Sequence, residues 1–518
     1  MLTVANLLLA VAALPAVFFL LCRYKDYQYE RKSAKHGCGK VPYLRNEPFG
    51  FKLATSGMQA FKENRVVWTM VGFFKRARAR TARIQTPGGG FSIVTQDPEN
   101  IKAVLATQFK EYDLQFRYKV FQPLLGDGIF TLSGNGWHHT RAMLRPQFTT
   151  EQVSRLNDLE HHSQVLIERF REKSHTGVPF DVQEFFFNLT LDTATEFLFG
   201  QSTNCNSFQG EKAKNDIDTA LRPSSEDFMN YFNIGQKWLL YRSIGDRLYY
   251  LVTGKDFKDS IKVCHSFVDY YVNKSLKLAE EQDAHEKENQ GRYIFLNELT
   301  KETRDPILMR DQAMNILIAG RDTTASLLSF IIAFLVRRKD VFEKLRTEIL
   351  NDFGTGTEKI TFQSLKRCEY LKNVINETLR VCPIVPRSAR QSNCDTTLPR
   401  GGGPDESEPV FVPKGTSVAY SIFALQHDKE LWGEDADEFR PERWETQRAQ
   451  PWTYVPFSGG PRICLGQQFA LTEAAYVIVR LCQTFSDITT TPENLEDFKH
   501  YVALTSCVAG GVNVVFKE

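Results

Sequence analysis

Apolar residues concentrate in three stretches of this chain, and each stretch predicts a helix. The first is Val4 to Cys22, in which Asn6 is the one clearly polar residue. The second follows the pair Asp305-Pro306 and ends near Lys339. In the third, Gln467 to Ile478, helix-forming residues carry apolar side chains at helical spacing. Long apolar helices either cross a membrane or fill a large core.

The first stretch is long enough to span a bilayer. Its 19 residues, at about 1.5 Å of rise each, give about 28 Å, which is close to the thickness of the hydrocarbon core. Basic residues follow it, whereas no charged side chain precedes it, so the positive-inside rule places the rest of the chain in the cytosol. These basic residues are Arg23, Lys25, Arg31, Lys32, Lys35 and Lys40. A cleaved secretory signal is the alternative, because Ala10 to Ala13 offers small residues, but the basic n-region of such signals is missing.

The bulk properties indicate one large domain behind this leader. We expect an anchor at residues 1–22, a basic and proline-containing hinge at 23–49, and a single domain at 50–518, because no repeat or long linker follows. The net charge is +2, from 64 basic and 62 acidic residues, so no nucleic-acid partner is indicated. Ten cysteines without paired spacing are typical of a reducing compartment.

The second stretch predicts a buried helix that is interrupted by polar residues. Asp305 is suited to cap the helix and Pro306 to occupy its first turn. Apolar residues then cover nearly all faces, except at Gly320-Arg321-Asp322-Thr323-Thr324. A glycine, two charges and two hydroxyls in mid-helix cost stability and favour a local opening of the helix. Such a conflict is expected at a functional site, although a polar notch satisfied by its own backbone is the alternative.

The remaining segments are less specific. Residues 150–273 predict helices with many aromatic side chains, which either pack in a core or line an apolar cavity; among them are Phe185, Phe186, Phe187, Phe197, Phe199, Phe228, Tyr231, Phe232, Tyr249 and Tyr250. Gly88 to Val94 predicts a hairpin turn leading into a strand, because it lacks the context of a dinucleotide-binding loop. The charged run Ala279 to Arg292 predicts a solvated loop.

A loop with a single cysteine precedes the third stretch. Gly459, Gly460 and Pro461 form turns, and Cys464 then lies at the start of the predicted helix. Free backbone amides and the positive end of the helix dipole favour a thiolate there, and Arg462 adds a positive charge. No second ligand stands at zinc spacing, so this thiolate suits the axial position of a haem better than a zinc site, while a buried free cysteine is the alternative.

This loop resembles the haem-binding loop of the cytochrome P-450 monooxygenases. The pattern Phe-x-x-Gly-x-Arg-x-Cys-x-Gly is filled by Phe457, Gly460, Arg462, Cys464 and Gly466. The resemblance implies a mainly α fold with small β sheets that encloses haem b, with Cys464 as the axial ligand of the iron. Similarity is greatest at Gly126 to Phe148, Ala319 to Ala325 and Phe457 to Glu473, where the chain resembles the yeast and fungal branch that oxidises n-alkanes and fatty acids.

The resemblance also implies roles for other residues, carried by three motifs. Gly320 to Thr324 resembles the oxygen-activation motif, in which Thr323 hydrogen-bonds the activated oxygen and Asp322 relays protons. Trp137 and Arg141, four residues apart, resemble the pair that donates to one haem propionate, and Arg462 would bind the other. His138 and His139 are then propionate neighbours or solvent-facing. Glu377, Arg380 and Arg443 resemble a buried structural network. Ala319 stands where some relatives carry a glutamate esterified to haem, so no covalent haem link is expected.

The implied function is hydroxylation of a lipophilic small molecule, most directly the terminal carbon of an n-alkane or fatty acid. Electrons would come from a separate NADPH-cytochrome P-450 reductase, with cytochrome b5 as a possible second donor, because the chain has no flavin or nicotinamide module. The anchor implies a single-pass protein of the endoplasmic reticulum membrane. Alternatives are a monooxygenase of a fungal secondary metabolite, a haem-thiolate isomerase or dehydratase, and a non-catalytic haem sensor or carrier.

Overall fold

The computed structural model describes residues 4–44, 51–86, 90–114, 116–149, 156–207, 224–244, 246–285 and 293–518. The single domain predicted for residues 50–518 is built as two compact units, and each takes three separate stretches of chain. The first unit comprises Met1–Asp113, Val385–Asp437 and Ala449–Ile463. The second unit comprises Leu114–Ile384, Glu438–Arg448 and Cys464–Glu518.

The first unit is organised by a six-stranded mixed sheet in the order β1-β2-β3-β9-β6-β4, with a separate β7-β8 hairpin. β2 and β3 pair antiparallel from Thr81↔Thr95 to Thr86↔Gly90, which confirms the predicted hairpin, although residues 87–89 lie outside the described part. Its strands are β1 (Tyr43–Leu44), β2 (Thr81–Thr86), β3 (Gly90–Thr95), β4 (Tyr112–Asp113), β6 (Arg387–Ser392), β7 (Thr396–Gly402), β8 (Glu408–Val412) and β9 (Ser417–Ser421). Its helices are α1 (Val4–Lys35), α2 (Phe51–Lys62), α3 (Val66–Ala77), α4 (Pro98–Lys102), a π-helical turn Ala103–Thr107, α17 (Ile422–Gln426) and α18 (Lys429–Trp432), with 3₁₀ turns at Phe109–Glu111 and Gly460–Arg462.

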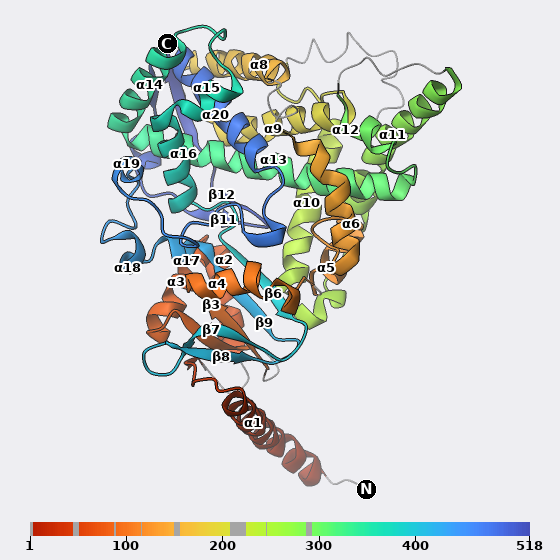
Figure 1. The fold of residues 1–518 in the computed structure, drawn as a ribbon, viewed down its shortest axis with the longest axis vertical. Helices are drawn as coiled ribbons and strands as arrows, with labels where there is room; N and C mark the ends of the chain where they lie inside the picture. Colours follow the sequence, from red (N-terminus) through yellow and green to blue (C-terminus); the bar gives the residue numbers. More distant parts are fainter. Residues whose placement is uncertain are drawn as a thin grey trace. The chain divides into compact units, whose positions relative to one another are not determined.

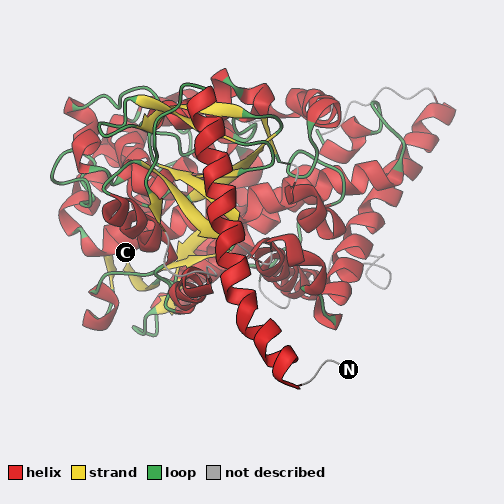
Figure 2. Cartoon of the chain, turned by 90° about the horizontal axis from the view of Figure 1, so that it is seen from below, coloured by secondary structure: helices red, strands yellow, loops and turns green. Residues whose placement is uncertain are grey.

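Helix α1 is longer than the predicted anchor. It runs without a break from Val4 to Lys35, and Figure 2 shows it as one continuous rod. Residues 23–35, which were predicted as part of a hinge, are helical. Side chains of this segment pack against the rest of the first unit, which supports the helix. Only residues 36–42 of the predicted hinge are irregular within the described part, and residues 45–50 lie outside it.

The second unit is mainly helical (Figure 1). Its helices are α5 (Phe116–Leu125), α6 (Gly134–Leu144), α8 (Asn157–Ser174), α9 (Val182–Phe199), α10 (Ser225–Ile244), α11 (Lys255–His285), α12 (Phe295–Leu299), α13 (Pro306–Arg337), α14 (Lys339–Phe353), α15 (Phe362–Arg367), α16 (Glu369–Val381), α19 (Arg443–Thr446) and α20 (Gln467–Thr484), with 3₁₀ turns at Arg145–Phe148, Asp246–Leu251 and Pro492–Leu495. Its strands are β5 (Phe180–Asp181), β10 (Asp487–Thr489), β11 (His500–Val502), β12 (Ser506–Val508) and β13 (Asn513–Lys517), which form a β10-β13-β5 sheet and a β11-β12 pair. The predicted fold, mainly α with small β sheets, is confirmed.

Helix α13 forms the centre of the second unit. It begins as predicted, because the Asp305 carboxylate accepts hydrogen bonds from the amides of Ile307 and Leu308. The helix packs against α9, α11, α16 and α20. Among the described residues, α13 alone is long and apolar enough to cross a membrane, but 83% of its most apolar window is buried inside the fold. It is therefore a core helix. The side chains of residues 4–15 lie outside the described part, so the N-terminal anchor stays a prediction.

The second unit corrects one other prediction and adds detail to a second. The charged segment that begins at Ala279 is helical as far as His285, because α11 continues through it, and residues 286–292 lie outside the described part. The aromatic side chains named in the middle third differ in burial: Phe186, Phe199, Phe228 and Phe232 are buried, and most of the others are partly buried. Phe228 stacks on Phe267 at 4.1 Å between ring centroids and is fully buried, whereas Tyr250 is exposed.

The predicted network of Glu377, Arg380 and Arg443 is assembled and almost completely excluded from solvent. Arg380 donates to both carboxylate oxygens of Glu377, at 2.8 and 2.9 Å, and Arg443 donates at 3.3 Å. The Trp444 indole and the Arg440 amide add hydrogen bonds at 3.0 Å each. One carboxylate thus ties α16 to the segment around α19, which precedes the cysteine loop in sequence.

We predict that Glu377→Ala destabilises the fold severely. It leaves two buried guanidinium groups without their carboxylate, and breaking a buried ion pair in this way costs about 3–5 kcal/mol. Glu298→Ala is a matched control, because Glu298 forms an ion pair with Lys301 at the same three-residue spacing on the surface, where such pairs contribute less than about 1 kcal/mol. Denaturant unfolding and the yield of haem-loaded protein measure both. Equal losses in the two variants would contradict the structural role of Glu377.

Candidate functional site

Cys464 lies directly before helix α20, as predicted. Gly466 is the N-cap of the helix, so the cysteine precedes the cap by two residues. The backbone amide of Gly466 donates a hydrogen bond to the thiol. Apolar and helix-forming residues then continue to Thr484, and the helix packs against α13, α8 and α14. The sulfur is therefore held at the positive end of a well-supported helix.

The electrostatics of Cys464 are balanced between opposing effects. The side chain has an exposed surface, yet burial among surrounding protein atoms raises the pKa of its thiol, while the Gly466 amide and the charge of Arg141 act to lower it. A sulfur that is desolvated but not covered faces a space that a ligand can fill. An anionic thiolate at this position gains its remaining stabilisation from a bound cation.

The donor set at Cys464 fits haem iron. Among the described residues no group of three or more His, Cys, Asp or Glu side chains is arranged to hold a metal ion. A metal held by Cys464 must therefore bring its other ligands, as haem iron does with its four porphyrin nitrogens. A Cβ placed on Gly466 would have only Phe148 nearby, at 3.9 Å, so the backbone beside the sulfur is open to a flat group.

The preceding loop, Phe457 to Arg462, belongs to the first unit. Its glycines are required by packing: Gly460 has a φ of +64°, and a Cβ there would overlap the carbonyl oxygen of Leu105 in the π-helical turn. Arg462 forms an ion pair with Asp113 at 3.3 Å and is largely buried. The binding of a haem propionate by Arg462 stays a prediction. The Asp113 carboxylate already neutralises part of the positive charge of Arg462. Phe457 is partly buried.

Trp137 and Arg141 lie on α6, one helical turn apart, as predicted. Trp137 is buried, and the Arg141 guanidinium carbon lies 5.7 Å from the centroid of its ring. Arg141 is close enough to Cys464 for its charge to influence the thiol, although burial is the larger effect and lowers the pKa of Arg141. His138 and His139 are exposed, which agrees with the solvent-facing alternative. The structure thus brings Arg141 and Cys464 together within the second unit.

The polar notch of α13 is present, but the expected opening is not seen. The helix continues through Gly320 to Thr324. Thr323 donates its hydroxyl proton to the carbonyl of Ala319 at 2.7 Å, one turn earlier. From α9, Thr190 donates to the carbonyl of Arg321 at 2.8 Å. The hydroxyl of Thr323 is therefore satisfied by the backbone in this state and must rotate before it can serve a ligand.

Asp322 is buried and engaged by its neighbours. It forms an ion pair with Arg321 at 3.0 Å and accepts a side-chain hydrogen bond from Gln236. Burial raises the pKa of Asp322, and the adjacent guanidinium acts to lower it. Arg321 also donates to Asn233 at 2.8 Å, which links this pair to α10. The carboxylate does not reach solvent, so a proton relay through Asp322 requires a partner to move.

Glu473 is a buried acid that the sequence reasoning missed. It lies on α20 and is only 3% exposed. It accepts a hydrogen bond from Thr193 of α9 at 2.6 Å and another from Thr324 of α13. Burial raises its pKa to about 7, against the lowering effect of these hydrogen bonds and of His162. The sequence predicts that Glu473 lies on the helix that follows Cys464. A single acid on an apolar helix does not reveal which residues of other helices it contacts.

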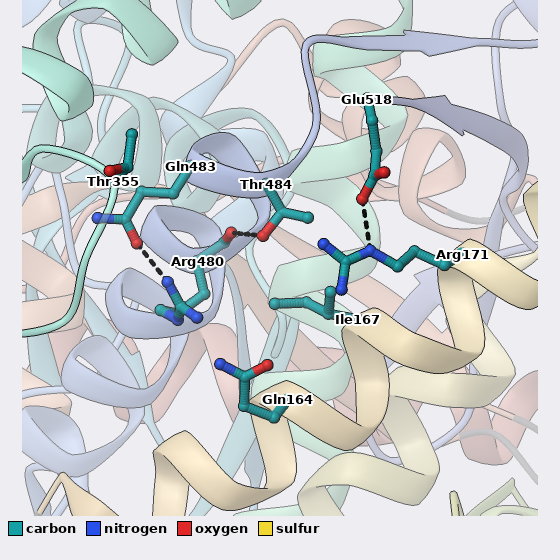
Figure 3. Close-up of a pocket in the computed structure, with 8 residues that line it drawn as sticks. All are labelled: Gln164, Ile167, Arg171, Thr355, Arg480, Gln483, Thr484 and Glu518. Atoms are coloured by element: carbon teal, nitrogen blue, oxygen red, sulfur yellow. Dashed lines mark hydrogen bonds and ion pairs between the residues drawn. The ribbon is translucent and has the colours of Figure 1, made fainter.

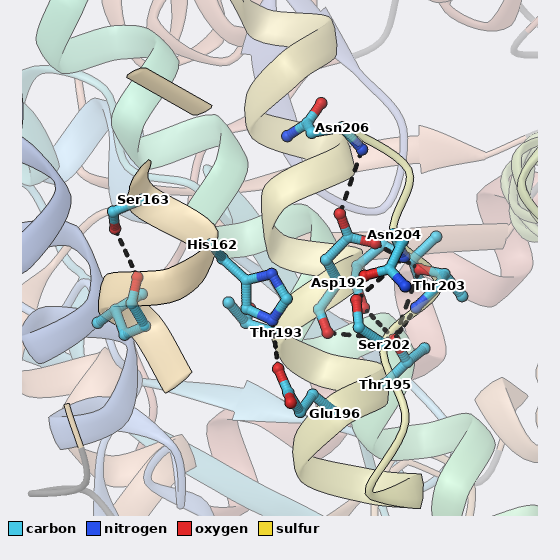
Figure 4. A network of polar contacts seen from close by, with 12 residues as sticks. His162, Ser163, Asp192, Thr193, Thr195, Glu196, Ser202, Thr203, Asn204 and Asn206 are labelled. Atoms are coloured by element: carbon cyan, nitrogen blue, oxygen red, sulfur yellow. Dashed lines mark hydrogen bonds and ion pairs between the residues drawn. The ribbon is translucent and has the colours of Figure 1, made fainter. Parts of the chain in front are cut away.

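The polar contacts beside Glu473 continue along α9 (Figure 4). His162 of α8 points toward Glu196 and contacts it directly. Asp192 accepts hydrogen bonds from the Thr203 hydroxyl at 2.7 Å and from the Cys205 amide at 2.8 Å. These contacts fix the turn after α9 and orient this helix against α13. They are structural supports rather than a second site.

A polar pocket of about 470 Å³ lies elsewhere in the second unit, between α8 and α20 (Figure 3). Its two arginines are already paired: Arg171 with Glu518, and Arg480 with Gln483 at 2.7 Å and Glu160 at 3.0 Å. None of the predicted site residues lines it. It is therefore not the functional site.

Comparison with known proteins agrees with this geometry. A sequence model of the family described as Cytochrome P450 matches residues 86–506. The chain belongs to the cytochrome P450 family. It is 48% identical over 470 residues to Cytochrome P450 52A12 of Debaryomyces hansenii, covering 88% of this chain and 87% of that protein. It is 47% identical over 477 residues to Cytochrome P450 52A10 of Candida maltosa, covering 90% of each. It is 51% identical to Cytochrome P450 52A3-B of Candida maltosa over 407 residues, or 77% of this chain and 76% of that protein.

These matches confirm the family predicted from the cysteine loop and the resemblance to its yeast branch. The protein is a cytochrome P450 monooxygenase with a haem iron cofactor. The role of Cys464 as the residue that holds the iron stays a prediction. The roles assigned to Trp137, Arg141, Asp322 and Thr323 at the site stay predictions.

We predict that Glu473 makes the stability of this P450 depend on pH. Its folded pKa of about 7 lies above the ordinary value of 4.5, so the native state binds this proton more tightly than the unfolded chain does. The associated stability is fully present below about pH 4.5 and is lost as the pH rises through about 7. Glu473→Gln keeps the neutral form, so we expect its stability advantage over the wild type to grow by on the order of 2–3 kcal/mol as the pH rises from 5 to 8.

Thermal unfolding of both proteins across this pH range measures the difference. Glu172→Gln is the control, because it removes an exposed carboxylate of α8 and should follow the wild type at every pH. A constant offset between Glu473→Gln and the wild type would contradict the raised pKa.

Proposed function

We propose that this cytochrome P450 hydroxylates the terminal carbon of n-alkanes or fatty acids, using dioxygen and electrons from an NADPH-dependent reductase. The observation that carries the monooxygenase chemistry is the joint placement of Cys464 before α20 and of Thr323 on α13, in helices that pack together. The substrate class is supported by the motifs that resemble the alkane- and fatty-acid-oxidising branch, and by relatives named Cytochrome P450 52A at 45–51% identity.

Each of the candidate residues in the second unit would have a separate role. Cys464 would hold the iron, and Arg141 with Trp137 would bind a propionate. When bound, haem supplies the oxidant that inserts oxygen into an unactivated C–H bond. Thr323 would turn its hydroxyl away from Ala319 and hold a proton at the oxygen-binding side, and Asp322 would replenish it once Arg321 or Gln236 yields.

The partners follow from the same proposal. The described residues include no module for a flavin or nicotinamide, so a membrane-bound NADPH-cytochrome P450 reductase is the proposed electron donor, with cytochrome b5 as a second one. The apolar run at Val4 to Cys22 would anchor the protein in the endoplasmic reticulum membrane with the catalytic units in the cytosol. A lipophilic substrate would then reach the enzyme from the bilayer in which it dissolves.

Product analysis tests the proposal. Microsomes that contain the full chain and added reductase are given dodecane, laurate and oleate, and NADPH- and oxygen-dependent products are identified. We expect terminal alcohols. Hydroxylation only of unrelated polycyclic compounds would overturn the substrate class, and a rearranged or dehydrated product formed without NADPH would replace the monooxygenase by an isomerase or dehydratase.

We also predict that Thr323→Ala keeps haem but uncouples electron use from product. Loss of the hydroxyl removes a proton donor, and positioned donors contribute about 10²–10⁴-fold to such steps, so product per NADPH should fall at least several-fold while peroxide rises. Ser329→Ala is the matched control, because Ser329 makes the same bond to a carbonyl one turn earlier, at 2.7 Å. Peroxide release is measured beside NADPH consumption. Unchanged coupling in Thr323→Ala would contradict its role.

A further inference from the structure

A buried arginine in the first unit binds helix α1 to the sheet. Arg83 of β2 is only 1% exposed. Its guanidinium carbon lies 3.8 Å from the ring centroid of Tyr29 and 4.2 Å from those of Tyr43 and Phe91. An arginine enclosed by three aromatic rings gains cation–π attraction that a lysine would not reproduce with the same planar stacking. We call this group the Arg83 cluster.

Helix α1 contributes Tyr29 to the cluster and also two carboxylates, Asp26 and Glu30, which we include in it. Asp26 forms an ion pair with Arg83 at 3.2 Å, and Glu30 lies 3.7 Å away. Together with Tyr29 they stand three and four residues apart, and so they share one face of the helix. Burial lowers the pKa of Arg83, whereas Tyr29, Tyr43 and Glu30 act to raise it. The carboxylates therefore offset the cost of burying the charge, and α1 is required for this.

Other contacts extend the attachment along α1. The Tyr29 hydroxyl donates to the carbonyl of Phe411 in β8 at 3.0 Å, and His36 stacks on the Phe411 ring at 4.6 Å. Ser33 is buried on the same part of the helix. Lys32 also reaches Asp395 at 3.2 Å, but this pair is exposed. These contacts dock the segment from Asp26 to His36 on the rest of the first unit.

The part of α1 before the cluster has the character of a bilayer interface. Leu20 and Leu21 are exposed, and Tyr24 and Tyr27 follow them with about 60% of their surfaces exposed. Tyrosines are enriched at the headgroup level of membranes, and basic residues bind anionic lipid. Asp26 to Glu30 lies four to eight residues after Cys22, which corresponds to about 6–12 Å of helix. The Arg83 cluster therefore holds α1 immediately next to the predicted membrane surface.

We propose that the Arg83 cluster fixes the angle between the membrane span and the first unit, so that this unit is presented to the bilayer in one orientation. This inference rests on the proposed membrane anchor. A helix that is continuous from the span into the docked segment transmits the orientation, whereas a flexible hinge would let the unit rotate. The partner is a phospholipid bilayer, and Arg83 is the residue that positions the first unit against it.

Distance measurement in liposomes tests the proposal on the full, haem-loaded chain. Spin labels are attached through genetically encoded ketone side chains, which spare the native cysteines, at Leu20 in the span and at Glu434, an exposed residue of the first unit. We expect one narrow distance distribution in the wild type and a broad one in Arg83→Met. Asp395→Asn is the matched control, because it breaks only the exposed contact between α1 and the same unit, and its distribution should stay narrow.

A second variant guards against misfolding of Arg83→Met. Replacing Tyr24 and Lys25 by glycine interrupts the helix between the span and the cluster without touching Arg83, and it should broaden the distribution equally. A narrow distribution in both variants would overturn the proposal. Flotation of the liposomes separates the two claims: protein that does not float contradicts the anchor itself, whereas protein that floats with unchanged distances contradicts only the role of Arg83.

Discussion

The proposed chemistry of this protein depends on one sulfur, that of Cys464, which is desolvated without being covered. Burial raises the pKa of the Cys464 thiol, while the Gly466 amide and the Arg141 charge favour its anion. An isolated thiolate would be costly at such a position, and a bound metal removes that cost. If Cys464 is the ligand of the iron, its thiolate would therefore be stabilised by the cofactor that it holds.

Helix α13 carries the opposite problem, a polar motif inside an apolar core. Most polar groups of this notch have a partner: Thr323 bonds the Ala319 carbonyl, and Asp322 pairs with Arg321. Contacts from α9 and α10 complete these bonds. The buried Nε of Arg321 has no partner. For the proposed proton relay, the Thr323 hydroxyl would have to rotate away from Ala319 and the Asp322 ion pair would have to separate. Polar groups inside an apolar helix lower the stability of the fold, and such a conflict is expected at a functional site.

Local patterns predicted the features whose cause is local. The cap at Asp305, the helix at Trp137 and Arg141, and the turn before Cys464 were all visible in a few consecutive residues. The Glu377 network and its burial were anticipated from its motif, and the structure shows both. By contrast, the extent of α1 depends on Arg83, which lies more than fifty residues further along the chain. The partners of Glu473 come from α9 and α13, and no periodicity in α20 could have shown them.

Reduction under carbon monoxide tests whether Cys464 binds the haem iron through its thiolate. The protein, reduced with dithionite and exposed to carbon monoxide, should show the red-shifted Soret band of thiolate-ligated ferrous haem, and Cys464→Ala should lose it. A Soret band at the position typical of histidine ligation in the freshly prepared wild type, or an unchanged red-shifted band in Cys464→Ala, would contradict the account.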